Sequence, residues 1–516
     1  MRNVVTVGAW TMASRVLGFL RDILIARFLG AGMAADAFFV ALRLPGLLRL
    51  LFGEGSFNAA FVPAFTATLA AEGEGAARRL AAETAAVMAA WLTLLALAGV
   101  LFMPAVVWGL APGFAALPAK FALAVRLGRI TFPYLMLICL AALLGGMLNG
   151  IGRFGPAAAA PVLFNVCMIA ALLGLSPLVG GPAYALAWGV TVSGMAQLCL
   201  LAAAAAAAGW GLRLSWPRVT PGVRLVFRRM VPGLVGAGVT QINLAVDVII
   251  ASLLPAGSVS VLYYADRVNQ LPLGVIGAAV GTALLPTLSR QLRLGEAAAA
   301  RASLNRAIEL SALLTLPAAA ALISEPGPVI AVLFGRGAFG AGDVARSAAA
   351  LVAYAAGLPA FVLVKVLAPG FFARGDTRTP VLIALAAMVL NIGFNLALMG
   401  PLAQVGVALA TTLAAWVNAA SLGVLLFRRG HWRPDARLAA RLWRMAAAGL
   451  AMAAGLRLAE AAGLAGLIAT PGLRWAGLAA LVALGLALYG GIGQGLRAFD
   501  WREVRAGLRP AARTGG

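Results

Sequence analysis

The chain has 516 residues, of which 62% are apolar and 11% are charged. Soluble domains carry about 25% charged residues, so this composition excludes a soluble enzyme and leaves no room for a folded extramembrane domain of ordinary size. A net charge of +23 on a soluble protein would suggest nucleic-acid binding. In a membrane protein, basic cytoplasmic loops explain such an excess, so nucleic acid is not an expected partner.

Apolar runs predict about fourteen membrane-spanning helices, since one span needs about 20 mostly apolar residues. The chain is therefore expected to be an all-α polytopic membrane protein. In chain order, the predicted spans cover residues 3–29, 34–53, 81–110, 127–149, 157–177, 182–208, 225–254, 264–289, 305–325, 346–372, 379–400, 404–427, 439–461 and 473–494.

Arginine-rich connections alternate with connections that hold few charges, and this alternation predicts the topology. Basic residues collect on the cytoplasmic side of a membrane. Both termini are therefore expected to be cytoplasmic. The basic positions after every second span include Arg78, Arg79, Arg153, Arg213, Arg218, Arg290, Arg293, Arg374, Arg378, Arg428 and Arg429, whereas the alternate connections hold little beyond Lys120, Arg336 and Arg474.

An internal repeat relates two six-span halves of the chain. Because six is even, the two copies should share one orientation in the membrane and surround a central cavity. The repeat predicts an N-terminal lobe over residues 1–222, a C-terminal lobe over 223–430, and two extra spans with a basic cytoplasmic tail over 431–516. Its matched positions, 222 to 227 residues apart, include Phe38-Phe39 with Tyr263-Tyr264, Gly73-Glu74 with Gly295-Glu296, and Asn165 with Asn391.

Several predicted spans carry charges, which cost about 2.5–3.5 kcal/mol each at the centre of a bilayer. Such side chains face a wet cavity or pair with one another, and arginines near span ends can reach the interface. A guanidinium matches phosphate oxygens, so a cavity lined by arginines predicts a phosphorylated anionic substrate. The charged positions are Arg15, Arg21, Asp36, Arg49, Glu54 and Arg267.

Four stretches of the chain carry a family resemblance: Ser14–Asp22, Gly30–Ala41, Phe61–Pro63 and Tyr263–Arg267. They resemble the MurJ (MviN) family of bacterial lipid II flippases, within the multidrug, oligosaccharidyl-lipid and polysaccharide exporter superfamily. The resemblance implies two lobes around a cationic cavity and a groove for the prenyl tail along the last two helices. It implies transport of lipid II, a disaccharide-pentapeptide on undecaprenyl diphosphate, to the periplasmic leaflet of the inner membrane by alternating access.

The resemblance also implies residue roles. Substrate binding would involve Arg15, Arg21, Asp36, Arg49 and Arg267, together with Glu54. A coupling-cation site would involve Asp247, Asn391, Asn395 and Thr411. Asn395 stands where sodium-binding relatives have a carboxylate, which weakens a site for a hard cation. Coupling to Na+, to H+ or to the membrane potential therefore stays open, and no resident metal or cofactor is expected.

Other functions of the same superfamily stay open as alternatives. The chain could export another lipid-linked glycan, or drugs, although an arginine-lined cavity disfavours hydrophobic cations. A membrane-embedded enzyme would need a general base or a metal site near the interface. The only histidine, His431, lies in a basic loop, so enzymatic activity is not expected.

Overall fold

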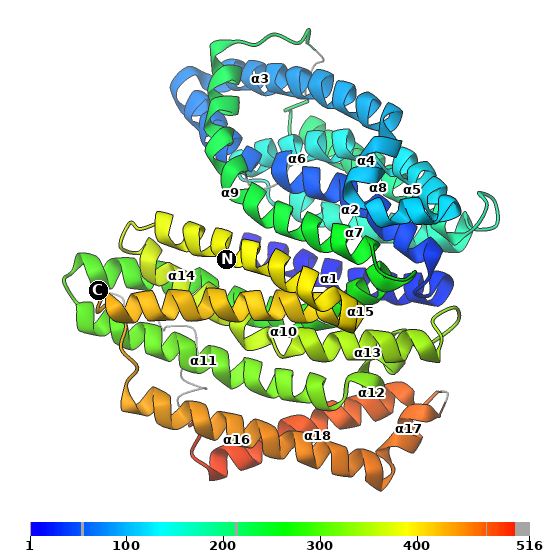
Figure 1. The fold of residues 1–516 in the computed structure, drawn as a ribbon. Coiled ribbons are helices and arrows are strands. Elements are labelled where there is room, and N and C mark those ends of the chain that lie inside the picture. The colour runs from blue at the N-terminus through cyan, green and yellow to red at the C-terminus, as the bar shows by residue number, and fades with distance from the viewer. Residues whose placement is uncertain (1, 53–55, 212–214, 471, 501–516) are drawn as a thin grey trace. The chain divides into compact units, whose positions relative to one another are not determined.

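The structure is a computed structural model that describes residues 2–52, 56–211, 215–470 and 472–500 (Figure 1). These residues are helical or form turns and loops, with no strand among them. The chain divides into two compact units. Unit 1 comprises Met1–Ser260 with Arg336–Phe339, and unit 2 comprises Val261–Gly335 with Gly340–Gly516.

In unit 1, helix α7 packs against both α1 and α8, while α6 lies between α3 and α8. Helix α9 packs against α2, α3 and α4. The compact unit thus extends past residue 222, and the predicted division into 1–222, 223–430 and 431–516 stays a prediction. The elements of unit 1 are α1 (Arg2–Leu29), α2 (Met33–Phe52), α3 (Ser56–Leu101), α4 (Met103–Leu110), the 3-10 turn η1 (Pro112–Ala116), α5 (Pro118–Thr131), α6 (Tyr134–Gly150), α7 (Gly155–Gly174), α8 (Pro182–Ala207) and α9 (Pro221–Ser252).

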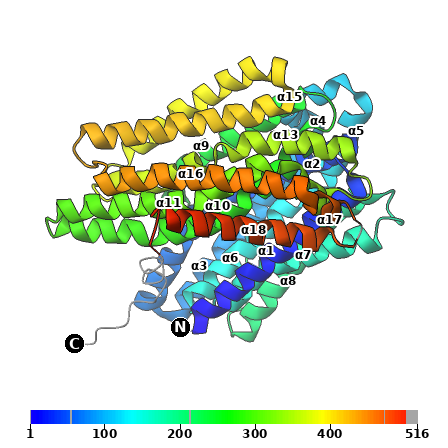
Figure 2. The same cartoon turned by 90° about the horizontal axis from the view of Figure 1, so that it is seen from below.

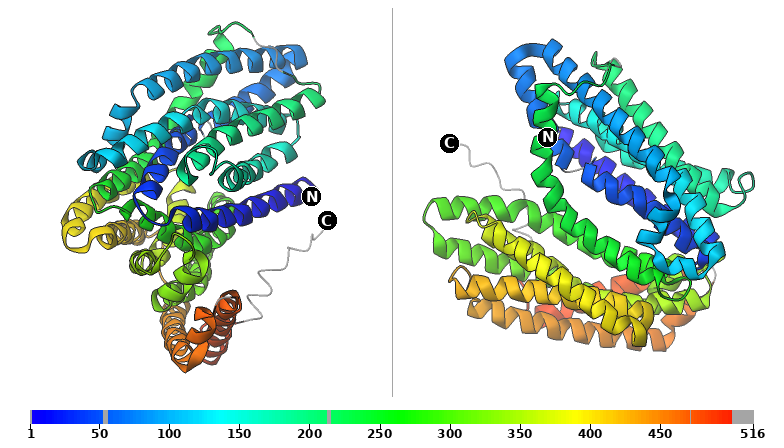
Figure 3. Two further views of the ribbon diagram at one scale, coloured as in Figure 1. Left: turned by 90° about the vertical axis from the view of Figure 1, so that its right-hand side faces the viewer. Right: turned by 45° about the horizontal axis from the view of Figure 1, so that its top comes forward.

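In unit 2, helix α16 packs against both α11 and α18 (Figure 2). Figure 3 shows α16 and α18 as adjacent orange and red helices. The elements are most of α10 (Ser258–Arg293), α11 (Ala297–Ser324), α12 (Pro326–Phe334), α13 (Ala341–Ala355), α14 (Leu358–Phe372), α15 (Arg378–Arg428), α16 (Ala436–Ala459), the π-turn η2 (Glu460–Leu464), α17 (Ala465–Ala469) and α18 (Arg474–Gly495).

Nine helical stretches among the described residues are long and apolar enough to cross a membrane. The structure confirms an all-helical polytopic membrane protein but not the count of fourteen spans. The charge-bearing helices α1 and α2 are not among the nine. Helix α15 has 51 residues, but its backbone is non-helical at Ala403, where φ is 46° and ψ is −127°. It therefore consists of two helical segments joined at Ala403, each long enough to cross a bilayer core.

Residues 56–80, which belong to none of the predicted spans, are helical. Helix α3 begins at Ser56 and changes direction at Gly73, where φ is 81°. Phe57, Phe61 and Phe65 are fully buried, with ring centroids 5.3 and 5.7 Å apart. Residues four apart share one face of a helix. This spacing of aromatic residues was therefore the helical signal.

The backbone repeats as the sequence does. Five turns in the first half contain a residue with positive φ, and each has a counterpart 221 to 227 residues later. All ten φ angles lie between 46° and 115°. The repeated architecture is thus confirmed by turn geometry, independently of side chains. The pairs are Gly30 with Gly257, Gly73 with Gly295, Gly152 with Gly375, Gly181 with Ala403, and Gly209 with Gly430.

Candidate functional site

Asp36 lies in the first turn of α2 and is fully buried in unit 1. Its Oδ2 accepts hydrogen bonds from Lys120 Nζ and from the backbone N–H of Gly257, both at 2.7 Å. Its Oδ1 accepts from the N–H and the hydroxyl of Ser260, both at 2.8 Å. Four donors therefore satisfy a carboxylate that would otherwise be costly to bury.

Lys120, the cationic partner of Asp36, is itself 2% exposed. Its Nζ lies 4.0 Å from the ring centroid of Phe114, so an aromatic face adds to the stabilisation of the charge. No role was predicted for Lys120 from the sequence. Its isolation in an otherwise apolar connection was the available signal, because a lone charge there needs a buried partner or solvent. Asp36 and Lys120 thus form the internal ion pair that was the alternative to a cavity charge.

Arg21 is also buried, with 5% of its surface exposed. Its Nε and Nη2 donate to Asp22 Oδ1 at 3.0 and 2.7 Å, and its Nη1 donates to Asn165 Oδ1 at 3.0 Å. The Asn165 amide in turn donates to the carbonyl of Ser14 at 3.0 Å. This network links α1 to α7 within unit 1. The guanidinium is therefore committed to packing contacts.

The remaining predicted arginines are more accessible. Arg15 is exposed on α1, and Arg49 is half-buried on α2, both in unit 1. Arg267 is half-buried in unit 2, where its Nε donates to the Tyr263 hydroxyl at 3.2 Å and its guanidinium lies 5.4 Å from that ring's centroid. Glu54 lies outside the described residues. The structure therefore separates two buried members of the predicted set from three that a ligand could reach.

The predicted coupling residues lie in both units. Asp247 is half-buried on α9 of unit 1. Asn391 and Asn395 are buried on α15 of unit 2, where the Asn395 amide donates to Asn391 Oδ1 at 3.2 Å. The Thr411 hydroxyl donates to the carbonyl of Val407 at 3.1 Å. Within the described residues, no group of three or more His, Cys, Asp or Glu side chains is placed to hold a metal ion.

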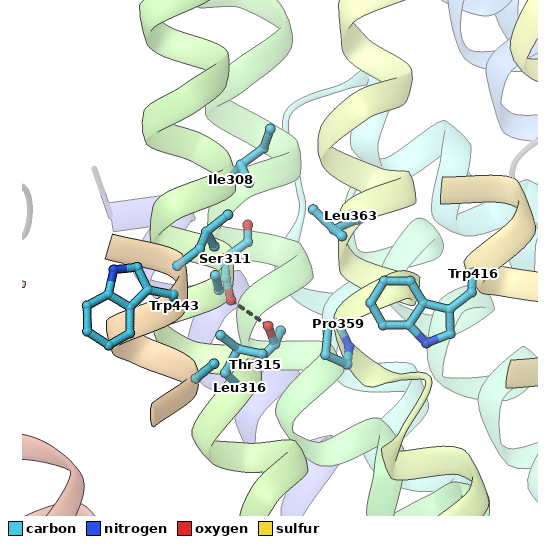
Figure 4. A pocket seen from close by; sticks show the side chains of 11 residues that line it. Ile308, Ser311, Thr315, Leu316, Pro359, Leu363, Trp416 and Trp443 are labelled. Atoms are coloured by element: carbon cyan, nitrogen blue, oxygen red, sulfur yellow. Dashed lines mark hydrogen bonds between the residues drawn. The ribbon is translucent and has the colours of Figure 1, made fainter. Parts of the chain in front are cut away.

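An apolar pocket of about 370 Å³ opens in unit 2 among α11, α14, α15 and α16 (Figure 4). Its wall includes two polar side chains whose hydroxyls are turned to their own helix. Ser311 donates to Ala307 at 2.7 Å, and Thr315 donates to Ser311 at 2.8 Å. The wall therefore presents mainly carbon to a ligand and suits a hydrocarbon chain. Other lining residues are Ile308, Leu316, Pro359, Leu363, Trp416 and Trp443.

A charged cluster beside this pocket ties α11 to α16. Glu309, 7% exposed, accepts hydrogen bonds from Arg306 and Arg441, and Arg437 Nη2 lies 3.5 Å from it. Arg306 also donates to Asp435, whose Oδ1 caps α16 by accepting from the backbone N–H of Leu438 at 2.7 Å. Sequence reasoning missed this cluster because its partners lie about 130 residues apart along the chain.

Known proteins resemble the chain over most of its length. The family model described as "Lipid II flippase MurJ" matches residues 25–471. A "Probable lipid II flippase MurJ" from Rhizobium meliloti (strain 1021) is 43% identical over 98% of this chain and 96% of its own length. One from Vibrio cholerae serotype O1 is 38% identical over 88% of each chain.

Solved structures agree with the fold. The structure titled "Lipid II flippase MurJ, inward closed conformation" has a TM-score of 0.80 and 23% sequence identity, and the match covers 97% of this chain and 100% of that one. An inward-facing multidrug resistance MATE family transporter has a TM-score of 0.67 at 16% identity, over 83% of this chain and 98% of that one. At these identities the matches establish the fold alone.

Proposed function

The chain belongs to the MurJ family of lipid II flippases, and we propose that it carries lipid II from the cytoplasmic to the periplasmic leaflet of a bacterial inner membrane by alternating access. The observation that most strongly supports this proposal is the 43% sequence identity to a probable lipid II flippase over 98% of the chain. The family is one of transporters, and the apolar helices fit a membrane setting. Export of another lipid-linked glycan or of drugs is the less favoured alternative.

The diphosphate of the substrate is assigned to Arg15, Arg49 and Arg267. Arg15 is exposed and the other two are half-buried, so an anion could reach all three, and a guanidinium can bind two phosphate oxygens at once. Arg21 and Asp36 are assigned a positioning role, because each is already held by buried hydrogen bonds.

The prenyl chain of the substrate is assigned in part to the apolar pocket beside α16. The pocket is lined mainly by carbon and flanked by Trp416 and Trp443. The resemblance implied a groove along the last two spans. The pocket involves α16 with α11, α14 and α15, whereas α18 contributes no lining residue. A chain segment would therefore lie against α16 and the helices of the second repeat.

The coupling ion is assigned to Asp247, Asn391, Asn395 and Thr411. The internal repeat supports this assignment, because Asp247 and Asn391 lie the same 226 residues after Arg21 and Asn165. Those two first-half residues are hydrogen-bonded at 3.0 Å. The set has one carboxylate and neutral oxygens, which disfavours a hard cation. We therefore favour coupling to protons or to the membrane potential over sodium.

Both termini are placed in the cytoplasm by the arginine-rich connections. Single cysteines at Gly75, Arg293 and Arg429 should then react with a membrane-impermeant thiol reagent only from the cytoplasmic side. A cysteine at Ala116 should react from outside. Labelling of the cysteine at position 293 from the periplasm would contradict this topology.

The transport proposal is tested by replacing Arg15, Arg49 and Arg267 one at a time in a bacterium depleted of its own flippase. Each Ala variant should lose flipping, read as lipid II retained in the cytoplasmic leaflet, while its abundance in the membrane stays near normal. Each Lys variant should recover only part, because it keeps the charge but loses the planar fork. Arg79→Ala, at an exposed position of α3, is the matched control and should flip normally. Normal flipping by all three Ala variants would contradict the assignment.

A further inference from the structure

Glu325 is a buried carboxylate at the corner between α11 and α12, one residue beyond the apolar stretch Ala297–Ser324. Its side chain is 0% exposed, and no donor from the described residues reaches either carboxylate oxygen. Arg457 Nε lies 3.7 Å from Oε1, beyond hydrogen-bonding distance, and the Arg457 side chain is 57% exposed. A buried and unsatisfied carboxylate of this kind is costly.

The neighbour of Glu325 is a second carboxyl group, that of Glu460, which lies beside the same Arg457 guanidinium. Glu460 begins the π-turn η2 at the end of α16, and Arg457 Nη1 lies 3.4 Å from its Oε2. Two ionised carboxylates cannot donate to one another and repel. One added proton converts the repelling pair into an O–H···O hydrogen bond and supplies the partner that Glu325 lacks.

The other charged groups on the elements around this corner are engaged elsewhere. On α13, Arg346 Nη2 lies 2.8 Å from Asp343 Oδ1. On α18, Arg474 donates to the carbonyl of Gly335 at 3.2 Å. Helix α17 has no ionisable side chain. The charge balance at the corner therefore depends on Glu325, Glu460 and Arg457: two acids and one base, which a single proton brings to neutrality.

We propose that Glu325 and Glu460 bind one proton between them, and that this proton latches the end of α16 to the α11–α12 corner. The proton comes from solvent, forms an O–H bond on one carboxyl group and leaves the other as the anion beside Arg457. The geometry lies within unit 2. Only its assignment to the periplasmic side rests on the topology proposed above, in which the connection after the ninth span is external.

The latch should respond to pH near neutrality. Burial raises the pKa of Glu325 from 4.5 to about 7, the Glu460 carboxyl adds to the rise, and Arg457 opposes it. Because this pKa is raised on folding, the folded chain holds the proton more tightly than the unfolded chain. The stabilisation is complete below pH 4.5 and is lost as the pH rises through about 7.

The π-turn at the end of α16 is where loss of the proton should change the backbone structure. Residues Glu460–Leu464 form a π-turn that contains Gly463 with φ of 124°. Wide turns of this kind inside helices often mark functional sites. When the proton leaves, repulsion between the two carboxylates acts on this turn. Backbone opening should then be confined to the region from about residue 456 to 470.

Infrared difference spectroscopy on the full-length protein in lipid nanodiscs tests the site. The wild type should show a protonated-carboxyl band that disappears with a midpoint near pH 7. Glu325→Gln and Glu460→Gln should each abolish that band, since an amide side chain can donate to the remaining carboxylate without titrating. Glu296→Gln, at an exposed carboxyl group, is the matched control and should leave the band unchanged.

Hydrogen exchange of residues 456–470 tests the latch on the same samples, after correction for the chemical effect of pH on exchange. Wild-type exchange should rise severalfold between pH 6 and pH 8, whereas exchange in Glu325→Gln should stay low at both. If one Gln variant fails to fold, the other carries the test. A band that persists in both Gln variants, or exchange equal at the two pH values in wild type, would overturn the proposal. Neither readout needs lipid II, so loss of flipping elsewhere leaves the result intact.

Discussion

The two halves of the internal repeat share their turns but not their charges. Positive-φ residues recur at five matched places, because an L side chain resists that conformation and restricts what can occupy it. Buried charges follow no such rule. In the first half, Arg21 pairs with Asp22 and Asn165. In the second half, Asp247 stands at the position that matches Arg21, and Asn391, the counterpart of Asn165, accepts a hydrogen bond from the neutral Asn395. Backbone geometry is thus the more durable record of the duplication.

Buried charges differ from turns because each depends on a partner supplied from elsewhere. The carboxylate of Asp36 is held by Lys120 and by the turn at Gly257 and Ser260. Loss of any one member leaves the others unsatisfied, so such clusters are retained or replaced as a group. The two halves could therefore acquire different polar interiors on one scaffold.

The largest effect on the free energy of unfolding is expected at the buried ion pair of Asp36 and Lys120 in the first half. Asp36→Asn or Lys120→Met alone should lower the free energy of unfolding by about 3–5 kcal/mol, because each leaves an uncompensated buried charge. The double variant should lose less than the sum of the two, since it removes both charges together. Chemical denaturation in mild detergent measures the three values. Additive losses would show that the two residues do not act as a pair.

A smaller effect is expected at the Arg21 network, where the two halves can be compared at matched positions. Asn165→Ala removes the acceptor of the charged Arg21 donor and should cost about 1.5–3 kcal/mol, while Asn391→Ala removes the acceptor of the neutral Asn395 amide and should cost about 1 kcal/mol. The same denaturation measurement gives both. Equal losses at the two positions would mean that the charge adds nothing to the first half, and the contrast between the halves would fail.

Much of the fold could be predicted from the sequence because it depends on local patterns. Apolar runs predicted most of the spans, and the similar offsets between matched residues predicted the repeat. The helix at Phe57, Phe61 and Phe65 was missed because polar and charged residues precede it. The site was harder, since Asp36 meets Lys120 across 84 residues and Arg21 meets Asn165 across 144. Without tertiary contacts, an arginine that pairs internally and one that faces a ligand look alike.

The smallest expected effect on stability concerns the matched turns at Gly181 and Ala403. Exchanging glycine and alanine at these two positions should change the free energy of unfolding in opposite directions. Ala403 has φ of 46° and ψ of −127°, and its counterpart is Gly181 with φ of 115°. A non-glycine residue in such a conformation destabilises the folded state by about 1–3 kcal/mol. Replacing it by glycine relieves this strain, but glycine also increases the conformational entropy of the unfolded chain, which offsets about 0.4–1 kcal/mol of the stabilisation. Ala403→Gly should therefore stabilise the protein by about 1 kcal/mol.

Gly181→Ala should destabilise by a similar amount. A Cβ at Gly181 would meet no atom within 4 Å, so the cost would arise from backbone conformation and not from a steric clash. Thermal unfolding of the two variants against wild type gives opposite shifts if the turns are equivalent. A neutral Ala403→Gly together with a tolerated Gly181→Ala would show that the turns only share an offset, and that side chains at these positions are free to vary in both halves.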